Sequence, residues 1–168
     1  MATLTSKIAL SVAANLAAAL DVGTGAHEVA FGPTYVLQNG TGANQANELW
    51  ADTRTIAASG SEDLDLSGGV SDIFGTSLAF TKIKALVVVA AAANTNDVVV
   101  GGAAANAIAS VFGDVSDTIR VKPGGMVALV APDAAGYALT AGTADLLKVA
   151  NSGAGSAVSF TIVVIGVV

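Results

Sequence analysis

The sequence contains no cysteine, which excludes disulfide bonds, thiolate metal sites and a cysteine nucleophile. Charged residues are also scarce, at 12% of the 168 residues, whereas an ordinary soluble domain has roughly 25%. Aromatic residues make up 5%, which is few for a carbohydrate-binding surface. The surface must therefore consist largely of Ala, Gly, Ser, Thr and Asn, and such a surface is suited to being covered by neighbouring molecules. We expect a protein that works inside an assembly.

Clusters of basic residues and long apolar runs are missing as well. The net charge is −6, from thirteen acidic and seven basic residues. Nucleic-acid binding requires cations that displace counterions from phosphates, so we expect no nucleic-acid partner. The longest uninterrupted apolar run, residues 85–93, is far shorter than the roughly 20 residues that span a bilayer. We therefore expect no membrane partner.

The beginning of the chain is similar to a short signal peptide, because Lys7 precedes the mostly apolar residues 8–20. However, Ser11 and Asn15 interrupt the apolar core, and a single lysine is a weak charged region for a signal. We expect this segment to belong to the mature protein.

Residues 81–89 are the most prominent strand signal in the chain. The segment begins with alternation through Thr81, Lys82 and Ile83 and continues as an apolar run from Ala85 to Val89. This change predicts a central strand that starts half exposed and ends buried on both faces.

The other strands are predicted to be short and separated by Gly-rich turns. Residues 13–20 could form a short helix, but the turn at 21–25 and the apolar residues after it favour a hairpin. Residues 103–112 are predicted to be a loop or one or two helical turns. Pro123-Gly124-Gly125 lies between two strand-like segments and predicts a second hairpin. The further strands are predicted at residues 7–12, 34–37, 49–56, 62–66, 98–100, 137–139, 146–149 and 158–168.

Roughly ten short strands at regular spacing, with glycines in the turns, are typical of an all-β sandwich or a jelly roll. Parallel strands would need helical crossovers, and the sequence has too few helix signals to supply them. We predict an all-β fold, a jelly-roll-like antiparallel β-sandwich with an N-terminal extended arm.

His27 is the sole histidine and is predicted to lie in a turn beside Glu28. A general base would need a nucleophile and an orienting acid, and a surface turn residue is the favoured interpretation. Trp50, the sole tryptophan, could stack on a sugar, but a core or interface aromatic is favoured.

The densest acidic group is Glu62, Asp63 and Asp65. Two carboxylates on one strand face could bind a hard cation or flank a glycosidic bond. A calcium loop needs more oxygen ligands, and Leu64 and Leu66 are expected to point inward, so a solvated strand face is favoured. Turns are favoured over oxygen-ligand sites for the remaining acidic and amide residues, which are Asn94, Asn96, Asp97, Asp114 and Asp117.

Two glycine-containing segments, Gly40-Thr41-Gly42 and Gly153-Ala154-Gly155, are not phosphate loops. Neither is followed by Lys-Ser/Thr, and neither opens a convincing helix. No serine lies in a nucleophile elbow. We therefore predict no catalytic, cofactor-binding or metal-binding residue, no cofactor and no enzymatic activity.

Several segments of residues 34–168 together resemble runs in short structural proteins of tailed bacteriophages. The resemblance implies a virion component, because small all-β proteins of this kind often decorate or cement the capsid as trimers bound over joints between major capsid proteins. It implies a homotrimer on the capsid exterior, made in the host cytoplasm, with the major capsid protein as partner. The segments are Gly40-Thr41-Gly42-Ala43-Asn44-Gln45-Ala46, Asp52-Thr53-Arg54-Thr55, Ser61-Glu62-Asp63-Leu64-Asp65-Leu66, Lys122-Pro123-Gly124-Gly125 and Thr140-Ala141-Gly142-Thr143-Ala144-Asp145.

Two alternatives stay open. A tail or spike component that contacts the host would predict sugar binding and exposed aromatic residues. An enzyme such as a cell-wall hydrolase would predict a cleft with an isolated pair of carboxylates.

Residues 1–33 lie largely outside the resemblance. We predict that they form an N-terminal arm or strand-exchange segment that reaches a neighbouring subunit, and that residues 34–168 form the β-sandwich domain.

Overall fold

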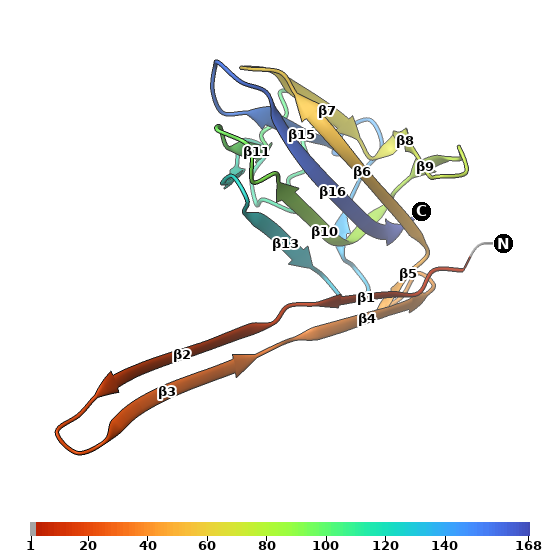
Figure 1. The fold of residues 1–168 in the computed structure, drawn as a ribbon. Helices are drawn as coiled ribbons and strands as arrows, with labels where there is room; N and C mark the ends of the chain where they lie inside the picture. The colour runs from red at the N-terminus through yellow and green to blue at the C-terminus, as the bar shows by residue number, and fades with distance from the viewer. Residues whose placement is uncertain (1–2) are drawn as a thin grey trace.

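The computed structural model describes residues 3–168, and the regular elements in this range are sixteen β-strands and no helix (Figure 1). This confirms the predicted all-β class. Residues 103–112 form a loop with turns and an isolated bridge at Ala107. The segment around residues 13–20 forms a strand, as predicted, rather than a helix.

Two sheets form the body of the protein. The first sheet has the strand order β13-β10-β16-β6, with β14 also paired to β10. The second sheet has the order β12-β11-β15-β7. Every pair in both sheets is antiparallel. The first sheet consists of β6 (Glu48–Ile56), β10 (Lys82–Ala90), β13 (Met126–Val130), β14 (Tyr137–Ala138) and β16 (Val158–Val167). The second consists of β7 (Ser61–Asp65), β11 (Val98–Gly101), β12 (Thr118–Val121) and β15 (Leu146–Asn151).

The two sheets share one apolar core. Alternate residues of the central strands point into it, as the period of two in their sequences predicts. From the first sheet these include Leu86, Val88, Phe160, Ile162 and Val164, and from the second Val98, Val100, Leu147 and Val149. The antiparallel sandwich is therefore a consequence of alternating strands whose apolar sides face one another.

Three smaller strand groups complete the fold. The sheet β1-β4-β5 lies against the outer face of the first sheet, where Leu37 and Ala46 pack on Ala85 and Ile165. The hairpin β2–β3 projects away from the body (Figure 1). These strands are β1 (Ser6–Ala9), β2 (Val12–Ala19), β3 (Thr24–Phe31), β4 (Thr34–Asn39), β5 (Gln45–Ala46) and the paired β8 (Ser67–Ser71) and β9 (Ser77–Ala79).

The hairpin predicted across Pro123-Gly124-Gly125 is wrong, although both of its strands exist. β12 pairs with β11 and β13 pairs with β10, so the turn carries the chain from one sheet to the other. The turn itself is tight, since Gly125 N donates to Lys122 O at 2.7 Å. Local turn chemistry specifies the reversal but not the partner of each strand.

The predicted exposure of the central strand is confirmed at its start, where Thr81 is exposed and Lys82 half-buried, and is wrong at its end. β10 is fully buried from Ile83 to Leu86, whereas Val89 near its end is 39% exposed. The reason is that β4 and β5 cover the outer face of the sheet only near Ala85.

Candidate assembly surface

The β2–β3 hairpin is exposed along its whole length except at Gly25, which is half-buried. No backbone hydrogen bond in the described part of the chain links β2 or β3 to the body; their ladder joins them to each other. A two-stranded hairpin alone is at best marginally stable in water. The hairpin therefore has two open faces and is suited to being covered by another molecule.

The register of the hairpin sorts its side chains into two chemically different sides, because directly opposed residues of an antiparallel pair point the same way. One side is mainly apolar, with Leu16 75% exposed and Phe31 62% exposed. We call it the apolar side. It consists of Val12, Ala14, Leu16 and Ala18, opposite Phe31, Val29, His27 and Gly25. The other side consists of Ala13, Asn15, Ala17 and Ala19, opposite Ala30, Glu28, Ala26 and Thr24.

The apolar side continues a side that is already packed on the body. The β1–β4 pair continues into the β2–β3 hairpin, and we call this two-stranded unit the ribbon. Ile8 faces Tyr35 in the β1–β4 pair, and Leu10 N donates to Pro33 O at 3.1 Å where the ribbon passes into the hairpin. Counting by twos along both strands, Ile8, Leu10 and Val12 share one side of the ribbon. Ile8 packs against the cluster on the outer face of the first sheet. The same ribbon side is thus covered at its root and exposed further out.

The outer face of the first sheet is itself only partly covered. A groove lies between this face and the root of the hairpin (residues at its wall include Leu10, Pro33, Val87, Met126, Ala128 and Val163). Met126 is 56% exposed. Beyond the groove, hydroxyl groups continue the face: Thr53 and Thr161 lie 3.0 Å apart and Thr55 and Ser159 2.8 Å apart, oxygen to oxygen. We call Val87, Val89, Met126, Ala128 and Val163 the open sheet face.

A second exposed apolar feature is the tip of the β8–β9 hairpin. Ile73 is 89% exposed, and Phe74 beside it is also exposed. The Asp72 carboxylate accepts hydrogen bonds from the backbone N–H groups of Phe74 and Thr76, both at 2.8 Å. The aspartate therefore holds a tight turn that presents two large apolar side chains to solvent.

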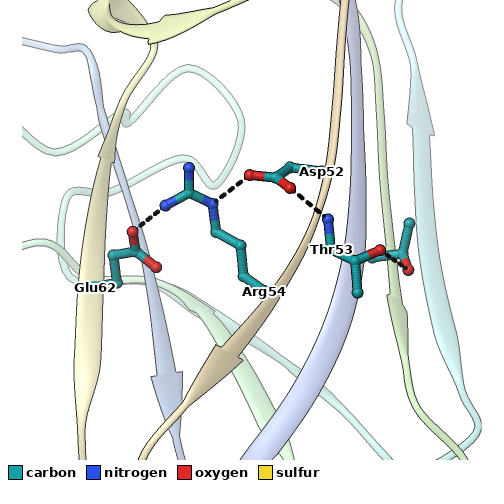
Figure 2. Close-up of polar contacts among 5 residues, drawn as sticks. Asp52, Thr53, Arg54 and Glu62 are labelled. Atoms are coloured by element: carbon teal, nitrogen blue, oxygen red, sulfur yellow. Dashed lines mark hydrogen bonds and ion pairs between the residues drawn. The ribbon is translucent and has the colours of Figure 1, made fainter. Parts of the chain in front are cut away.

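Arg54 forms a polar cluster beside the sandwich core (Figure 2). Its Nε donates to Asp52 Oδ2 at 2.9 Å, and its Nη1 also contacts Glu62. The guanidinium carbon lies 5.6 Å from the centre of the Trp50 ring. Trp50 is 5% exposed, so the indole is a core aromatic, and the cluster links β6 to β7.

The acidic group at residues 62–65 lies as the alternation predicts. Leu64 and Leu66 are buried, while Asp63 is exposed. Asp65 accepts a hydrogen bond from Ser67 N at 2.8 Å, and Glu62 is engaged by Arg54. These contacts support the solvated strand face that the sequence favoured.

The amides and acid of residues 94–97 hold a turn, as predicted. Asn94 Nδ2 donates to Ser159 O at 2.9 Å, and Asn94 Oδ1 accepts from Ser159 N at 2.8 Å. Asp97 is largely buried and contacts Lys122 at 2.9 Å and Arg120 at 3.2 Å. The hydrogen bond from Lys122, and next that from Arg120, lowers the pKa of Asp97 against the opposing effect of burial. Residues 94–97 therefore stabilise the fold.

Asp114 and Asp117 also form a turn, because Asp117 accepts from Asp114 N at 3.1 Å and Asp114 accepts from Ser116 N at 2.9 Å. His27, by contrast, was expected in a turn and lies on β3 opposite Leu16. Glu28 points to the other side of the hairpin. The structure therefore does not bring His27 and Glu28 together as an acid–base pair.

In Gly40-Thr41-Gly42, the backbone N–H of Gly42 donates a hydrogen bond to the side-chain Oε1 of Gln45 at 2.8 Å. The Gly42 carbonyl also accepts a hydrogen bond from the buried Lys84 ammonium at 3.2 Å, and Asp133 O is the second acceptor of Lys84. Burial lowers the pKa of Lys84, with Asp133 acting in the opposite direction. Gly153 O accepts from the Asn96 amide at 3.1 Å. Both glycine segments are thus held by side chains of this chain.

The sequence did not reveal that Lys84 is buried and donates hydrogen bonds to the carbonyls of two loops, since a lysine in an alternating strand is expected to face water. In residues 3–168 no group of three His, Cys, Asp or Glu side chains could hold a metal ion. In the same range no helix is long and apolar enough to cross a membrane.

Comparisons with known proteins returned no match. No protein-family model, no curated protein and no solved structure matches the chain.

Proposed function

We propose that the protein is a structural component of the virion of a tailed bacteriophage, a capsid decoration or cement protein without enzymatic activity. In this proposal, homotrimers sit on the capsid exterior and bind across joints between major capsid proteins. The single observation that carries the proposal is the projecting β2–β3 hairpin, whose apolar side is exposed on a chain with 12% charged residues. A chain that works as a free monomer has no evident use for such a hairpin.

The strand orders support the finer description of the fold as a jelly roll. Two antiparallel four-strand arrays, β13-β10-β16-β6 and β12-β11-β15-β7, are joined by connections that mostly pass between the sheets. These strand orders and connections support the proposal of two interlocked Greek keys. In the proposal, residues 1–33 act as an arm, with β1 at its root on the body and the hairpin β2–β3 as its reaching part.

The proposed mechanism is mechanical. A protein that binds the assembled shell and not its separated subunits shifts the equilibrium toward the shell by mass action. The gain is about 2.7 kcal/mol per site when the free protein is present at 100 times its dissociation constant. Hydroxyl surfaces such as the pairs Thr53–Thr161 and Thr55–Ser159 supply contact area without the desolvation of charges.

The test is co-sedimentation of the purified chain with empty expanded shells of the phage that encodes it, followed by heating of the loaded shells. We expect saturable binding and a higher temperature of shell disruption. Failure to sediment with shells under any loading would refute the cement role.

A tail or spike component is the second candidate, favoured by the exposed tip at Ile73 and Phe74, whose turn Asp72 holds. It predicts binding to host cells or their surface glycans, and a Phe74→Ser variant would lose that binding while keeping the fold.

A further inference from the structure

The apolar side of the hairpin needs a cover, and the ribbon itself indicates which surface fits. At its root, the same ribbon side lies on the outer face of the first sheet, with Ile8 and Leu37 packed near Ala85 and Ile165. A surface that accepts the first residues of an apolar stripe is chemically suited to accept the next ones. In the remaining part of that outer face, the open sheet face, Val89, Met126 and Ala128 are exposed and Val87 and Val163 are half-buried.

The hairpin does not cover the open sheet face of its own chain. β2 and β3 extend from β1 and β4 and lead away from the body (Figure 1). Eight residues per strand correspond to about 26 Å of ribbon at about 3.3 Å per residue, so the distal residues lie well beyond the sheet edge. The distal apolar side and the open sheet face are therefore available to two different copies.

The lack of charge on both surfaces also favours a second copy. The apolar side of the hairpin has no Asp, Glu, Lys or Arg, because Glu28 points to the other side and Asp21 lies in the turn between β2 and β3. The open sheet face has none either. These two surfaces can therefore be buried against each other without the desolvation of a charge.

We propose that the apolar side of the β2–β3 hairpin of one copy packs on the open sheet face of a second copy. The inference deepens the proposed assembly function and rests on it. Each copy offers one hairpin and receives one, so the contact is head-to-tail and closes into a ring when the rotation between copies permits it. Such a ring agrees with the proposed trimer.

The absence of cysteine allows a direct test by cross-linking. One chain carries Val29→Cys on the apolar side, and a second, differently tagged chain carries Ala128→Cys on the open sheet face. The matched control replaces Val29→Cys by Ala30→Cys, the next residue on the other side of the same exposed strand. The two chains are mixed without shells, treated with a short bis-maleimide, and separated by mass under denaturing conditions.

We expect the Val29→Cys pair to give a product containing both tags, at least about fivefold more than the Ala30→Cys pair. Equal yields from the two pairs would overturn the inference. A chain carrying both Val29→Cys and Ala128→Cys that cross-links within itself at high dilution would also overturn it, because the hairpin would then fold back on its own body.

A second measurement uses exposed residues whose replacement does not disturb the core. Leu16→Asn on the apolar side should weaken self-association about tenfold, from loss of most of the burial of one leucine. Ala17→Asn on the other side should change it less than about twofold. Equal effects of the two substitutions would contradict the inference. These measurements contain no shells, so they are independent of the co-sedimentation test. If the copies associate with one another but do not bind shells, only the cement role is refuted. If the chain is a monomer that binds shells, only this inference is refuted.

Discussion

Replacing residues 12–31 by Asn-Gly should leave the stability of the isolated body unchanged. Val12 faces Phe31 across the hairpin ladder, so Ser11 and Gly32 flank the cut and a two-residue turn can join them. None of the buried side chains of the two apolar clusters lies in the removed segment. We expect the free energy of unfolding to change by less than about 1 kcal/mol.

The magnitude follows from what the hairpin contributes to the body. It supplies no core contact, and an isolated hairpin is itself marginal. Shortening a flexible loop adds about 0.6 kcal/mol for each halving. β2 and β3 are paired strands rather than a flexible loop, so the gain from shortening this connection should be smaller. By comparison, removing one large core side chain costs about 3 to 5 kcal/mol.

The assay is urea unfolding followed by the fluorescence of Trp50, which is the sole tryptophan and lies in the core. At a concentration where the wild-type chain is monomeric, both proteins should unfold at the same urea concentration. At higher concentration the wild type alone should gain stability, because association through the hairpin favours the folded state. A loss of more than about 2 kcal/mol in the shortened chain at low concentration would refute the reasoning, since the hairpin would then support its own body.

Three further predictions concern the body. Phe160→Ala removes a fully buried ring and should lower the free energy of unfolding by about 3 to 5 kcal/mol in urea titrations. Gly166→Ala would place a Cβ against Lys82 O and 2.8 Å from the Phe80 ring, so calorimetry should show a loss of about 1 to 3 kcal/mol. The pKa of Asp97 is lowered in the folded state, so its stabilising effect is complete above its ordinary value of 3.8 and is lost as the pH falls through the lower folded value. The stability difference between wild type and Asp97→Asn should accordingly be constant near neutral pH and shrink below about pH 4, and a difference independent of pH would contradict it.

The sequence supports the fold class because the decisive patterns are local. The alternation of Phe160, Ile162 and Val164 and the short apolar segment Val98-Val99-Val100 predict strands whatever their partners are. The strand over residues 13–20 was also predictable, since the turn after it favours a hairpin over a helix.

Which strands pair, and which residues other parts of the chain cover, could not be predicted in the same way. The turn at Gly124 joins strands of different sheets because each strand pairs where its apolar side meets the core, which is a property of the whole chain. Lys84 is buried because loops distant in the sequence, at Gly42 and Asp133, place their carbonyls around it. In the sequence, the apolar side of the hairpin was visible only as Val12 and Leu16 among alanines. That this side continues to Ile8 could be seen only from the pairing registers of β1–β4 and β2–β3.

The measurement that tests the central claim most directly is the molar mass of the purified chain in solution, by light scattering over a range of concentrations, beside the variant with residues 12–31 replaced by Asn-Gly. The claim is that this chain is built to associate with its own copies through the β2–β3 hairpin. The account predicts a trimer for the full chain and a folded monomer for the variant. A full chain that stays monomeric at every concentration, or a variant that forms the same trimer, would contradict it.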